Sequence, residues 1–170
     1  MRAVLLLGVL ALAPAGALAD FTGRVVKVAD GDTLTVLVEK KRIRVRLEGI
    51  DAPEWDQTYG KQSRRSLSQL CARKEVRVVA RGKDPYGHTL GVVTCAGVEA
   101  NTEQVRRGMA WAFKRYVPMG SALYEVETYA RLRKLGLWAD ARPIPPWDWR
   151  QAPRPKAGKR RVTNTKRLER

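Results

Sequence analysis

The sequence predicts an α+β domain built around a five-stranded barrel with three helices. Two observations lead to this class: three strand-like segments come before the first helical pattern, and two further strands precede a helical end. The length supports a single domain, because 170 residues are enough for one proper core and too few for two comfortable ones.

The first three strands are predicted from alternation and turns. Residues 21–28 (FTGRVVKV) are strand-like and end at a turn. Residues 33–38 alternate, with aliphatic side chains on one face. After a turn at Lys40-Lys41, residues 42–47 alternate strictly, with aliphatic residues on one side and three arginines on the other. Short connections between sequential strands predict an antiparallel, half-buried meander.

A helix and two more strands complete the predicted barrel. Apolar residues at i, i+3 and i+4 predict a helix around residues 59–72. Residues 75–80 and 89–95 are the fourth and fifth strands, and the loop at 81–87 between them is rich in turn formers. Three strands, a helix and two strands fit an OB-fold, in which a helix connects the third and fourth strands.

The second half of the chain predicts two more helices. Asn101 with Gln104 resembles a capping box at the start of a short helix, which Gly108 ends. A longer helix begins at Gly120-Ser121 and stops near residue 136. The residues expected on its buried stripe are Leu123, Val126, Tyr129 and Ala130.

Three tryptophans outside the helical patterns raise separate questions. Trp147 and Trp149 are expected to pack the end of the chain onto the domain. Trp55 directly follows Glu54, and the sequence leaves open whether it packs or stacks on a base.

The first residues indicate a secretory signal peptide. Arg2 supplies a positive charge, residues 3–13 are apolar, and residues 17–19 (ALA) offer a cleavage site. A membrane anchor is the alternative, but the apolar run is shorter than the roughly 20 residues that span a bilayer. We therefore expect residues 1–19 to be removed, leaving a secreted or periplasmic protein without stable membrane association.

The chain is strongly basic, with a formal net charge of +16 and a pI of about 10.5. Residues 150–170 hold nine Lys or Arg and one acidic residue, and we expect this tail to be disordered until bound. A basic domain at 20–149 with a basic tail predicts sequence-independent binding of DNA and RNA. Charge alone leaves a solubilising surface or attraction to anionic lipids as alternatives. A monomer is expected.

Cys71 and Cys95 are the only cysteines. In an exported protein an even pair is more often bridged than free, so a disulfide is the hypothesis and buried free thiols are the alternative. Two cysteines and a single histidine cannot supply the usual four ligands of a structural zinc site.

Two carboxylate clusters flank the second and third strands and form a candidate metal site. Asp32 lies in the first cluster, and Asp51 and Glu54 lie in the second. Such hard oxygen donors suit Ca²⁺ or Mg²⁺, and because they are few, waters and a substrate phosphate would complete an open shell. On spacing alone, a hairpin turn and a helix approach explain these residues equally well.

Arg46 lies on the polar face of the third strand, five residues before Asp51. A rise of about 3.3 Å per residue keeps the two within one short span. The guanidinium can bind a phosphate with two parallel hydrogen bonds. A solvated charge is the alternative, and it is a fair interpretation of Arg42 and Arg44.

These motifs together resemble the staphylococcal (micrococcal) nuclease family. Each motif alone is weak, but the combination is highly specific and covers roughly residues 21–149. The resemblance implies an OB-fold, Ca²⁺-dependent phosphodiesterase that acts on DNA and RNA and leaves 3′-phosphate ends. The segments that carry it are DGDT at 30–33, Arg46-Leu47, IDAPE at 50–54, DPYGHTL at 84–90, 101–111 and GLW at 136–138.

The resemblance also implies roles for individual residues. Asp32 and Asp51 would ligate Ca²⁺ through their carboxylates. Ala52, where the family usually has threonine, would contribute its backbone carbonyl. Glu54 would position or deprotonate the attacking water, and Arg46 would bind the phosphate.

Four residues near the implied nucleotide pocket complete the set. Tyr86, Tyr116 and Lys83 would bind substrate, whereas His88 departs from the family pattern, which has a catalytic arginine there. An ordinary histidine has a pKa near 6.5 and is mostly neutral above pH 7, whereas arginine stays charged. As imidazolium, histidine could donate a proton to the leaving 5′-oxygen.

Several functions therefore stay open. The chain is a nuclease that works best at lower pH, a weak nuclease, or a non-catalytic OB-fold protein that binds nucleic acid. A basic protein that coats acidic surface polymers is a more distant alternative. We favour retained activity, because the predicted metal-binding and water-activating residues are present.

Overall fold

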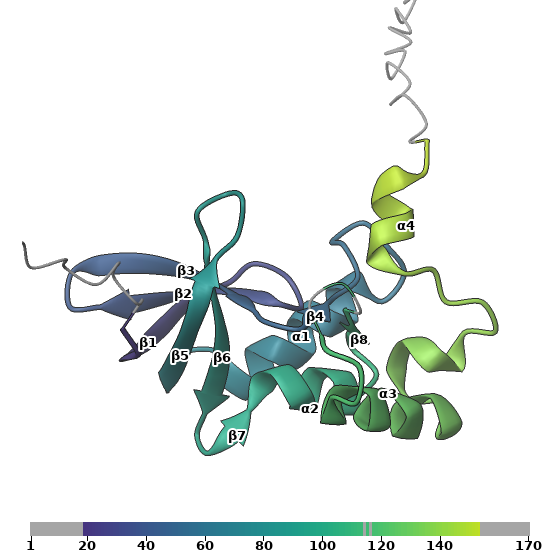
Figure 1. Ribbon diagram of the computed structural model, residues 1–170. Coiled ribbons are helices and arrows are strands. Elements are labelled where there is room, and N and C mark those ends of the chain that lie inside the picture. The colour runs from purple at the N-terminus through teal and green to yellow at the C-terminus, as the bar shows by residue number, and fades with distance from the viewer. Residues whose placement is uncertain (1–18, 114, 116, 154–170) are drawn as a thin grey trace, which may run out of the picture.

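The centre of the fold is a closed five-stranded barrel, seen in a computed structural model that describes residues 19–113, 115 and 117–153 (Figure 1). Neighbouring strands pair in the order β3-β2-β1-β5-β6, and parallel pairing of β3 with β6 closes the barrel. The predicted α+β class and five-stranded OB-fold barrel are confirmed. The strands are β1 (Phe21–Val28), β2 (Thr33–Val38), β3 (Lys41–Leu47), β5 (Glu75–Lys83) and β6 (Thr89–Cys95), with a short extension β7 (Val98–Glu99) beside β6.

Alternation explains how the β2–β3 hairpin is placed. Thr33 lies opposite Arg46, so the aliphatic residues of both strands share the inner face. The turn is Glu39-Lys40, one residue earlier than predicted, with Glu39 at a φ of 52°, and β3 therefore begins at Lys41. The hairpin residues that are fully buried in the core are Leu34, Val36, Val45 and Leu47.

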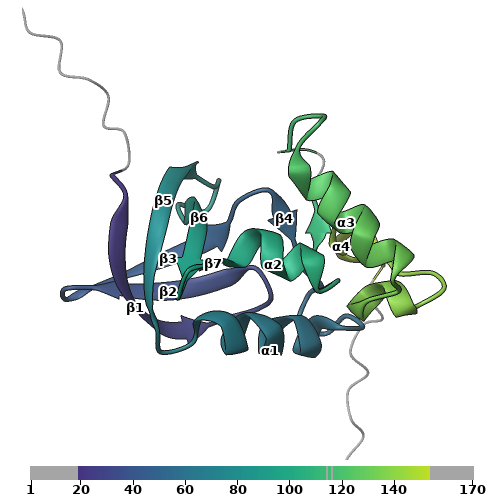
Figure 2. The same cartoon turned by 90° about the horizontal axis from the view of Figure 1, so that it is seen from below.

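The helices gather on one side of the barrel (Figure 2). In both views α3 (Ala122–Leu132) and α4 (Pro146–Gln151) lie beyond the short strands β4 (Ile50–Asp51) and β8 (Trp111–Ala112), on the side away from the barrel. The three predicted helices are present, whereas the last two helical segments were not predicted. The helices are α1 (Gly60–Cys71), α2 (Ala100–Arg106), α3 (Ala122–Leu132), the 3₁₀ helix η1 (Gly136–Ala139) and α4 (Pro146–Gln151).

A small ladder connects the barrel to the helical part. β4 (Ile50–Asp51) pairs antiparallel with β8 (Trp111–Ala112), and Asp51 lies opposite Trp111. Two residues per strand are too few for a recognisable alternation, which is why the sequence did not predict this ladder. The ladder fixes the backbone of Asp51, one of the predicted metal-binding residues.

The predicted capping box at α2 is wrong. The N-cap residue is Glu99, and it makes no side-chain capping bond. Asn101 instead donates through Nδ2 to the carbonyls of Glu48 and Gly91, at 2.9 and 3.1 Å, and accepts from Val93 N at 3.0 Å. Because a buried amide needs partners for its polar atoms, these bonds tie α2 to the barrel instead of capping the helix.

One residue of the expected stripe on α3 is exposed. Ala130 is fully buried, and Leu123 and Val126 pack against the core, but Tyr129 is 44% exposed. Its ring lies under Arg133, at 5.5 Å from the guanidinium. A tyrosine that borders the apolar stripe can face water when a cation covers its ring.

The predicted disulfide between Cys71 and Cys95 is present. It joins the last residue of α1 to the last residue of β6, and both cysteines are buried. The covalent link closes a sequence separation of 24 residues and attaches α1 to the barrel.

The end of the described chain packs onto the domain, as expected for its tryptophans. Trp147 stacks on Phe113 at 5.4 Å and meets Trp111 edge-on at 6.3 Å. Trp149 Nε1 donates to Asp56 Oδ1 at 3.4 Å. The predicted boundary of the tail at residue 150 is therefore too early, because α4 continues through Gln151.

Parts of two predicted segments lie outside the described residues, namely 1–18 of the signal peptide and 154–170 of the tail. Within the described ranges, no helix has the length and apolar character needed to cross a membrane.

Candidate metal and phosphate site

The turn before β2 lies in close contact with α1 and α2. These contacts determine the position of Asp32. A Cβ atom on Gly31 would come within 1.8 Å of Ser63 Oγ and 2.8 Å of Ala52 Cβ, so no side chain fits there. Gln104 on α2 donates from Nε2 to the Gly31 carbonyl at 2.6 Å. The close approach to α1 and the hydrogen bond from α2 together hold the turn.

Asp32 is a buried carboxylate with defined partners. It is 5% exposed, and its oxygens accept from Thr33 Oγ1 at 2.7 Å and from Ala52 N at 2.9 Å. Burial raises the pKa of Asp32 to about 6, and the charge of Asp30 adds to this, although Arg46 and the hydrogen bonds act in the opposite direction. Its surroundings therefore destabilise the ionised form of Asp32.

Asp51 is the second buried carboxylate, and it is 1% exposed. Arg46 Nη2 donates to its Oδ1 at 3.1 Å. Burial raises the pKa of Asp51, and the charge of Asp32 adds to this, even though hydrogen bonds from Arg150 and the charge of Arg46 favour ionisation. The predicted neighbours Asp32, Arg46 and Asp51 are thus brought together.

Arg150 on α4 lies in the candidate site, although it was predicted to belong to the disordered tail. Its Nη2 donates to Asp51 Oδ2 at 2.6 Å, and its Nη1 donates to Asp51 Oδ1 at 3.2 Å and to Glu54 Oε1 at 2.7 Å. The hydrogen bonds to Asp51, together with those to Glu54, raise the pKa of Arg150 above its ordinary value. The assignment to the tail is wrong for this residue, because Trp147 anchors α4 beside the site.

Glu54 lies at the more open side of the site. Its side chain is 35% exposed, and its backbone N–H donates to Gln57 Oε1 at 3.0 Å. Gln57 in turn donates from Nε2 to the carbonyl of Ile144 at 2.6 Å. The segment that leads to α4 therefore also orients the loop that carries Glu54.

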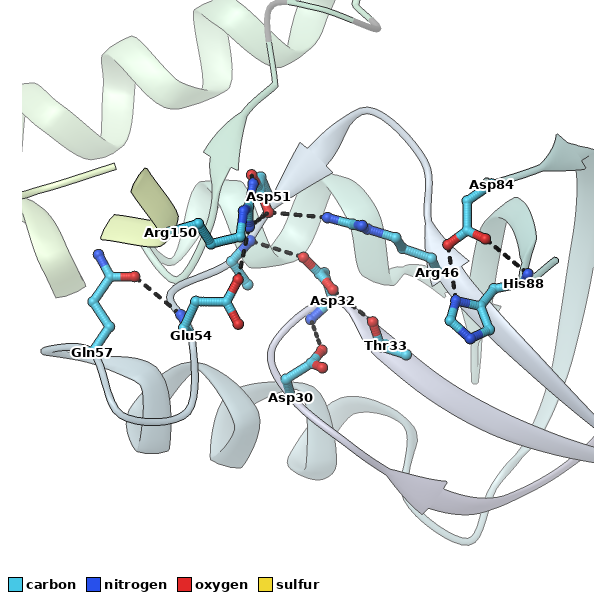
Figure 3. A network of polar contacts seen from close by, with 11 residues as sticks. Asp30, Asp32, Thr33, Arg46, Asp51, Glu54, Gln57, Asp84, His88 and Arg150 are labelled. Carbon is cyan, nitrogen blue, oxygen red and sulfur yellow. Dashed lines mark hydrogen bonds and ion pairs between the residues drawn. The ribbon is translucent and has the colours of Figure 1, made fainter. Parts of the chain in front are cut away.

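These groups share a cavity of about 400 Å³ (Figure 3). The side chains of Asp32, Asp51 and Arg150 converge in the close-up view, with Arg46 reaching toward them. The residues that line the cavity are Asp30, Asp32, Thr33, Arg44, Arg46, Asp51, Ala52, Pro53, Glu54, Asp84, Pro85, Tyr86, His88, Phe113 and Arg150.

The two buried carboxylates fit an open cation site. Burial and mutual repulsion destabilise the charges of Asp32 and Asp51, so a cation between them would relieve both. Their oxygens suit Ca²⁺ or Mg²⁺. Within the described ranges, no group of three or more His, Cys, Asp or Glu side chains is arranged to hold a metal by itself. Waters and a phosphate would therefore have to supply the remaining ligands.

His88 lies at the other side of Arg46 from the carboxylates in the close-up view (Figure 3). Its Nδ1 lies 2.8 Å from Asp84 Oδ2, and its backbone N–H and that of Tyr86 both donate to Asp84 Oδ1 at 2.9 Å. Burial raises the pKa of Asp84, but these hydrogen bonds outweigh burial and leave the pKa below its ordinary value. Because an ionised carboxylate only accepts, the proton belongs on Nδ1.

The remaining predicted substrate-binding residues are spread around the cavity. Tyr86 is 81% exposed at its rim, and its ring lies 6.2 Å from that of His88. Lys83 donates to Thr89 Oγ1 at 2.9 Å and lines an adjoining cavity of about 490 Å³ that Arg46 also borders. Tyr116 lies outside the described residues.

The fold and the cavity define an OB-fold protein in which two buried carboxylates and two arginines form a candidate site for a cation and a phosphate. Comparison with known proteins identifies its family. Residues 44–140 match the family model described as staphylococcal nuclease homologue. The chain is 45% identical over 144 residues to a micrococcal nuclease of Shigella flexneri, which covers 79% of this chain and 83% of that protein.

Two further relatives extend the comparison. The chain is 46% identical over 132 residues to an uncharacterized endonuclease of Haemophilus influenzae, covering 76% of this chain and 73% of that protein. It is 38% identical over 161 residues to Protein ParB of Escherichia coli, covering 89% and 90%. The chain belongs to the staphylococcal nuclease family.

Two residues of the candidate site were not predicted from the sequence. Asp84, the partner of His88, was placed in a turn-rich loop and in the family segment at 84–90, but it was given no role of its own. Arg150 follows two tryptophans and a helix-starting Pro146. That pattern of aromatic anchors on a short helix was the available signal that Arg150 belongs to the folded domain.

Proposed function

We propose that the chain is a Ca²⁺-dependent nuclease that hydrolyses phosphodiester bonds of DNA and RNA to 3′-phosphate products, and that it acts after export. The observation that carries the proposal is the placement of two buried carboxylates, Arg46 and Glu54 around one cavity. A protein that only bound a polyanion would gain nothing from carboxylates that repel it. The family relationship supports the same activity.

The residues of the candidate site have different roles in the proposed hydrolysis. Asp32 and Asp51, with the Ala52 carbonyl, would hold Ca²⁺, which would stabilise negative charge on the phosphate. Glu54 accepts the proton of the attacking water as the new oxygen–phosphorus bond forms. Arg46 is 29% exposed at its side chain, so its guanidinium can reach both Asp51 and a phosphate in the cavity. The bond from phosphorus to the 5′-oxygen then breaks.

The tautomer of His88 determines whether its ring can assist the last step, in which the 5′-oxygen leaves the phosphorus. With Nδ1 facing the Asp84 carboxylate, the neutral ring has only an acceptor at Nε2. Only the imidazolium form can donate from Nε2 to the leaving 5′-oxygen or to the phosphate. The Asp84 contact therefore supports a nuclease whose rate declines as the imidazole loses its proton.

Digestion of a plasmid and of a ribosomal RNA fragment tests the proposal directly. We expect cleavage of both substrates with Ca²⁺ and none with a chelator, and terminal analysis should find 3′-phosphates. Glu54→Gln keeps an oxygen that accepts from Arg150 but removes the base, so its kcat should fall on the order of 10²–10⁴-fold. No cleavage by the wild-type protein from pH 5 to 9 would favour the nucleic-acid-binding alternative.

Export is tested separately from catalysis. Periplasmic and culture fractions of an expressing bacterium should contain a protein whose mass corresponds to a start near Asp20. Recovery of the full-length chain in the cytoplasm alone would contradict export without affecting the proposed activity.

A further inference from the structure

The residue after Glu54 presents a large apolar ring to solvent. Trp55 is 52% exposed, unlike Trp111 and Trp138, which are buried. Exposed aromatic rings in a basic setting are the usual stacking surfaces for the bases of single-stranded nucleic acid. The surroundings of Trp55 decide whether this ring belongs to such a surface.

Cations surround the ring of Trp55. The guanidinium carbon of Arg64 lies 5.3 Å from the ring centre, and Lys61 Nζ lies 5.9 Å away. Arg64 is held in place, because its Nε donates to the carbonyl of Val28 at 3.0 Å. Helix α1 also carries Arg65 and contains no acidic residue between 60 and 71. The positive charge around Trp55 is thus not neutralised by its own helix.

Two surface hollows meet at Trp55. One, of about 300 Å³, is lined by the ring together with Lys61, Arg64, Arg65 and Ser68. The other, of about 500 Å³, is lined by the ring, Lys61 and the loop residues at 56–59. The indole has room for a base on its open face, and the first hollow, which is lined by three cations, has room for the adjoining phosphates. Asp56 lines the second hollow, so the phosphates are expected on the α1 side of the ring.

The position of Trp55 also connects it to the candidate site. Trp55 directly follows Glu54, and consecutive Cα atoms are about 3.8 Å apart, so the subsite and the candidate site lie on adjoining parts of one loop. The loop is oriented by the hydrogen bond from Glu54 N to Gln57 at 3.0 Å.

We propose that Trp55, Lys61, Arg64 and Arg65 form a subsite for a single-stranded segment of nucleic acid that flanks the bond at the candidate site. A base stacks on the indole, and the adjoining phosphates pair with the three cations. Duplex bases are already stacked on one another, so the subsite selects unpaired strands. The inference rests on the proposed function for the identity of its ligand.

Binding measured without cleavage tests the subsite. Fluorescence anisotropy in a chelator, with a thymidine oligonucleotide of about ten nucleotides, should show roughly 10-fold weaker binding for Trp55→Ala. A dinucleotide, which covers only the candidate site, should bind the variant and the wild type alike. Trp55→Phe, which keeps a stacking ring, should retain most of the affinity. For Lys61→Ala, the slope of the logarithm of the binding constant against the logarithm of the salt concentration should be about 0.7 shallower.

Tyr129→Ala is the matched control. Tyr129 is a similarly exposed ring, with Arg133 at 5.5 Å, but it lies on α3 and outside the cavity. Its loss should leave oligonucleotide binding unchanged. The subsite is refuted if Trp55→Ala binds the longer oligonucleotide normally, or loses affinity for both lengths equally, while its melting temperature matches the wild type. Absence of Ca²⁺-dependent cleavage would refute the proposed function, but the binding experiment would still test the subsite.

Discussion

The guanidinium of Arg150 contacts both carboxylate oxygens of Asp51, at 2.6 and 3.2 Å, across a sequence separation of 99 residues. The same group reaches Glu54 at 2.7 Å. A cation bound to Asp51 would share these oxygens with Arg150, and two positive groups in such proximity repel each other. Arg150 is therefore an internal counter-ion of the candidate metal site.

Arg150→Ala should bind Ca²⁺ more tightly than the wild type. A unit charge about 5 Å from a divalent ion costs on the order of 1–2 kcal/mol even in water, so we expect roughly 10-fold higher affinity. Isothermal titration calorimetry measures the change directly. Arg106→Ala is the matched control, because Arg106 also makes two contacts to one carboxylate, that of Glu103, at 2.6 and 2.7 Å. Unchanged or weaker Ca²⁺ binding by Arg150→Ala would rule out competition.

Asp32 should make the metal-free protein less stable as the pH rises. Burial raises its pKa from 3.8 to about 6, so the folded state holds the proton more tightly than the unfolded state. The resulting stability is fully present below pH 3.8 and is lost as the pH rises to about 6. The loss should be on the order of 2–3 kcal/mol, measured by urea denaturation in a chelator.

Asp32→Asn isolates this effect. An amide can still accept from Ala52 N, but it carries no charge. The free energy of unfolding of the variant should therefore decline much less between pH 4 and 6 than that of the wild type. Without metal, the variant should be more stable than the wild type at pH 7. It should also lose Ca²⁺ affinity. If the two proteins show parallel pH dependence, the burial of Asp32 does not control stability.

His88→Arg should cut faster than the wild type in alkaline solution. Arginine keeps its charge at every working pH, and the ionised Asp84 beside position 88 offers it a partner. The ratio of the two cleavage rates should therefore grow with pH, to at least about 10-fold at pH 9. His88→Gln serves as the control that removes the titrating group without adding a charge. Superimposable pH–rate profiles of wild type and His88→Arg would count against a role for the imidazolium.

Reduction of the Cys71–Cys95 disulfide should lower stability and leave the cavity in place. Closing a loop of 24 residues contributes about 3 kcal/mol in the chain-entropy model. Guanidinium denaturation with and without reductant measures the difference. Titration of the unreduced, denatured protein should find no free thiol, and two thiols per chain would contradict the bridge.

Much of the barrel could be predicted because its signals are local. Alternation in residues 33–38 and 42–47 specifies which side chains face the core, whatever the rest of the chain does. The grouping of Asp32, Arg46 and Asp51 followed from the same short segment. Asn101 could not be predicted correctly, since its amide satisfies carbonyls on the barrel that no local pattern reveals.

By itself the sequence determined the barrel, the paired carboxylates and the family, because these depend on periodicity and on motifs that are close together along the chain. The tertiary structure alone decided that Arg150 enters the site, that Asp84 assigns the proton on His88, and that Trp55 faces solvent beside Lys61 and Arg64. Each of these outcomes depends on which surfaces meet when distant segments pack. That packing is set by burial and electrostatics across the whole domain.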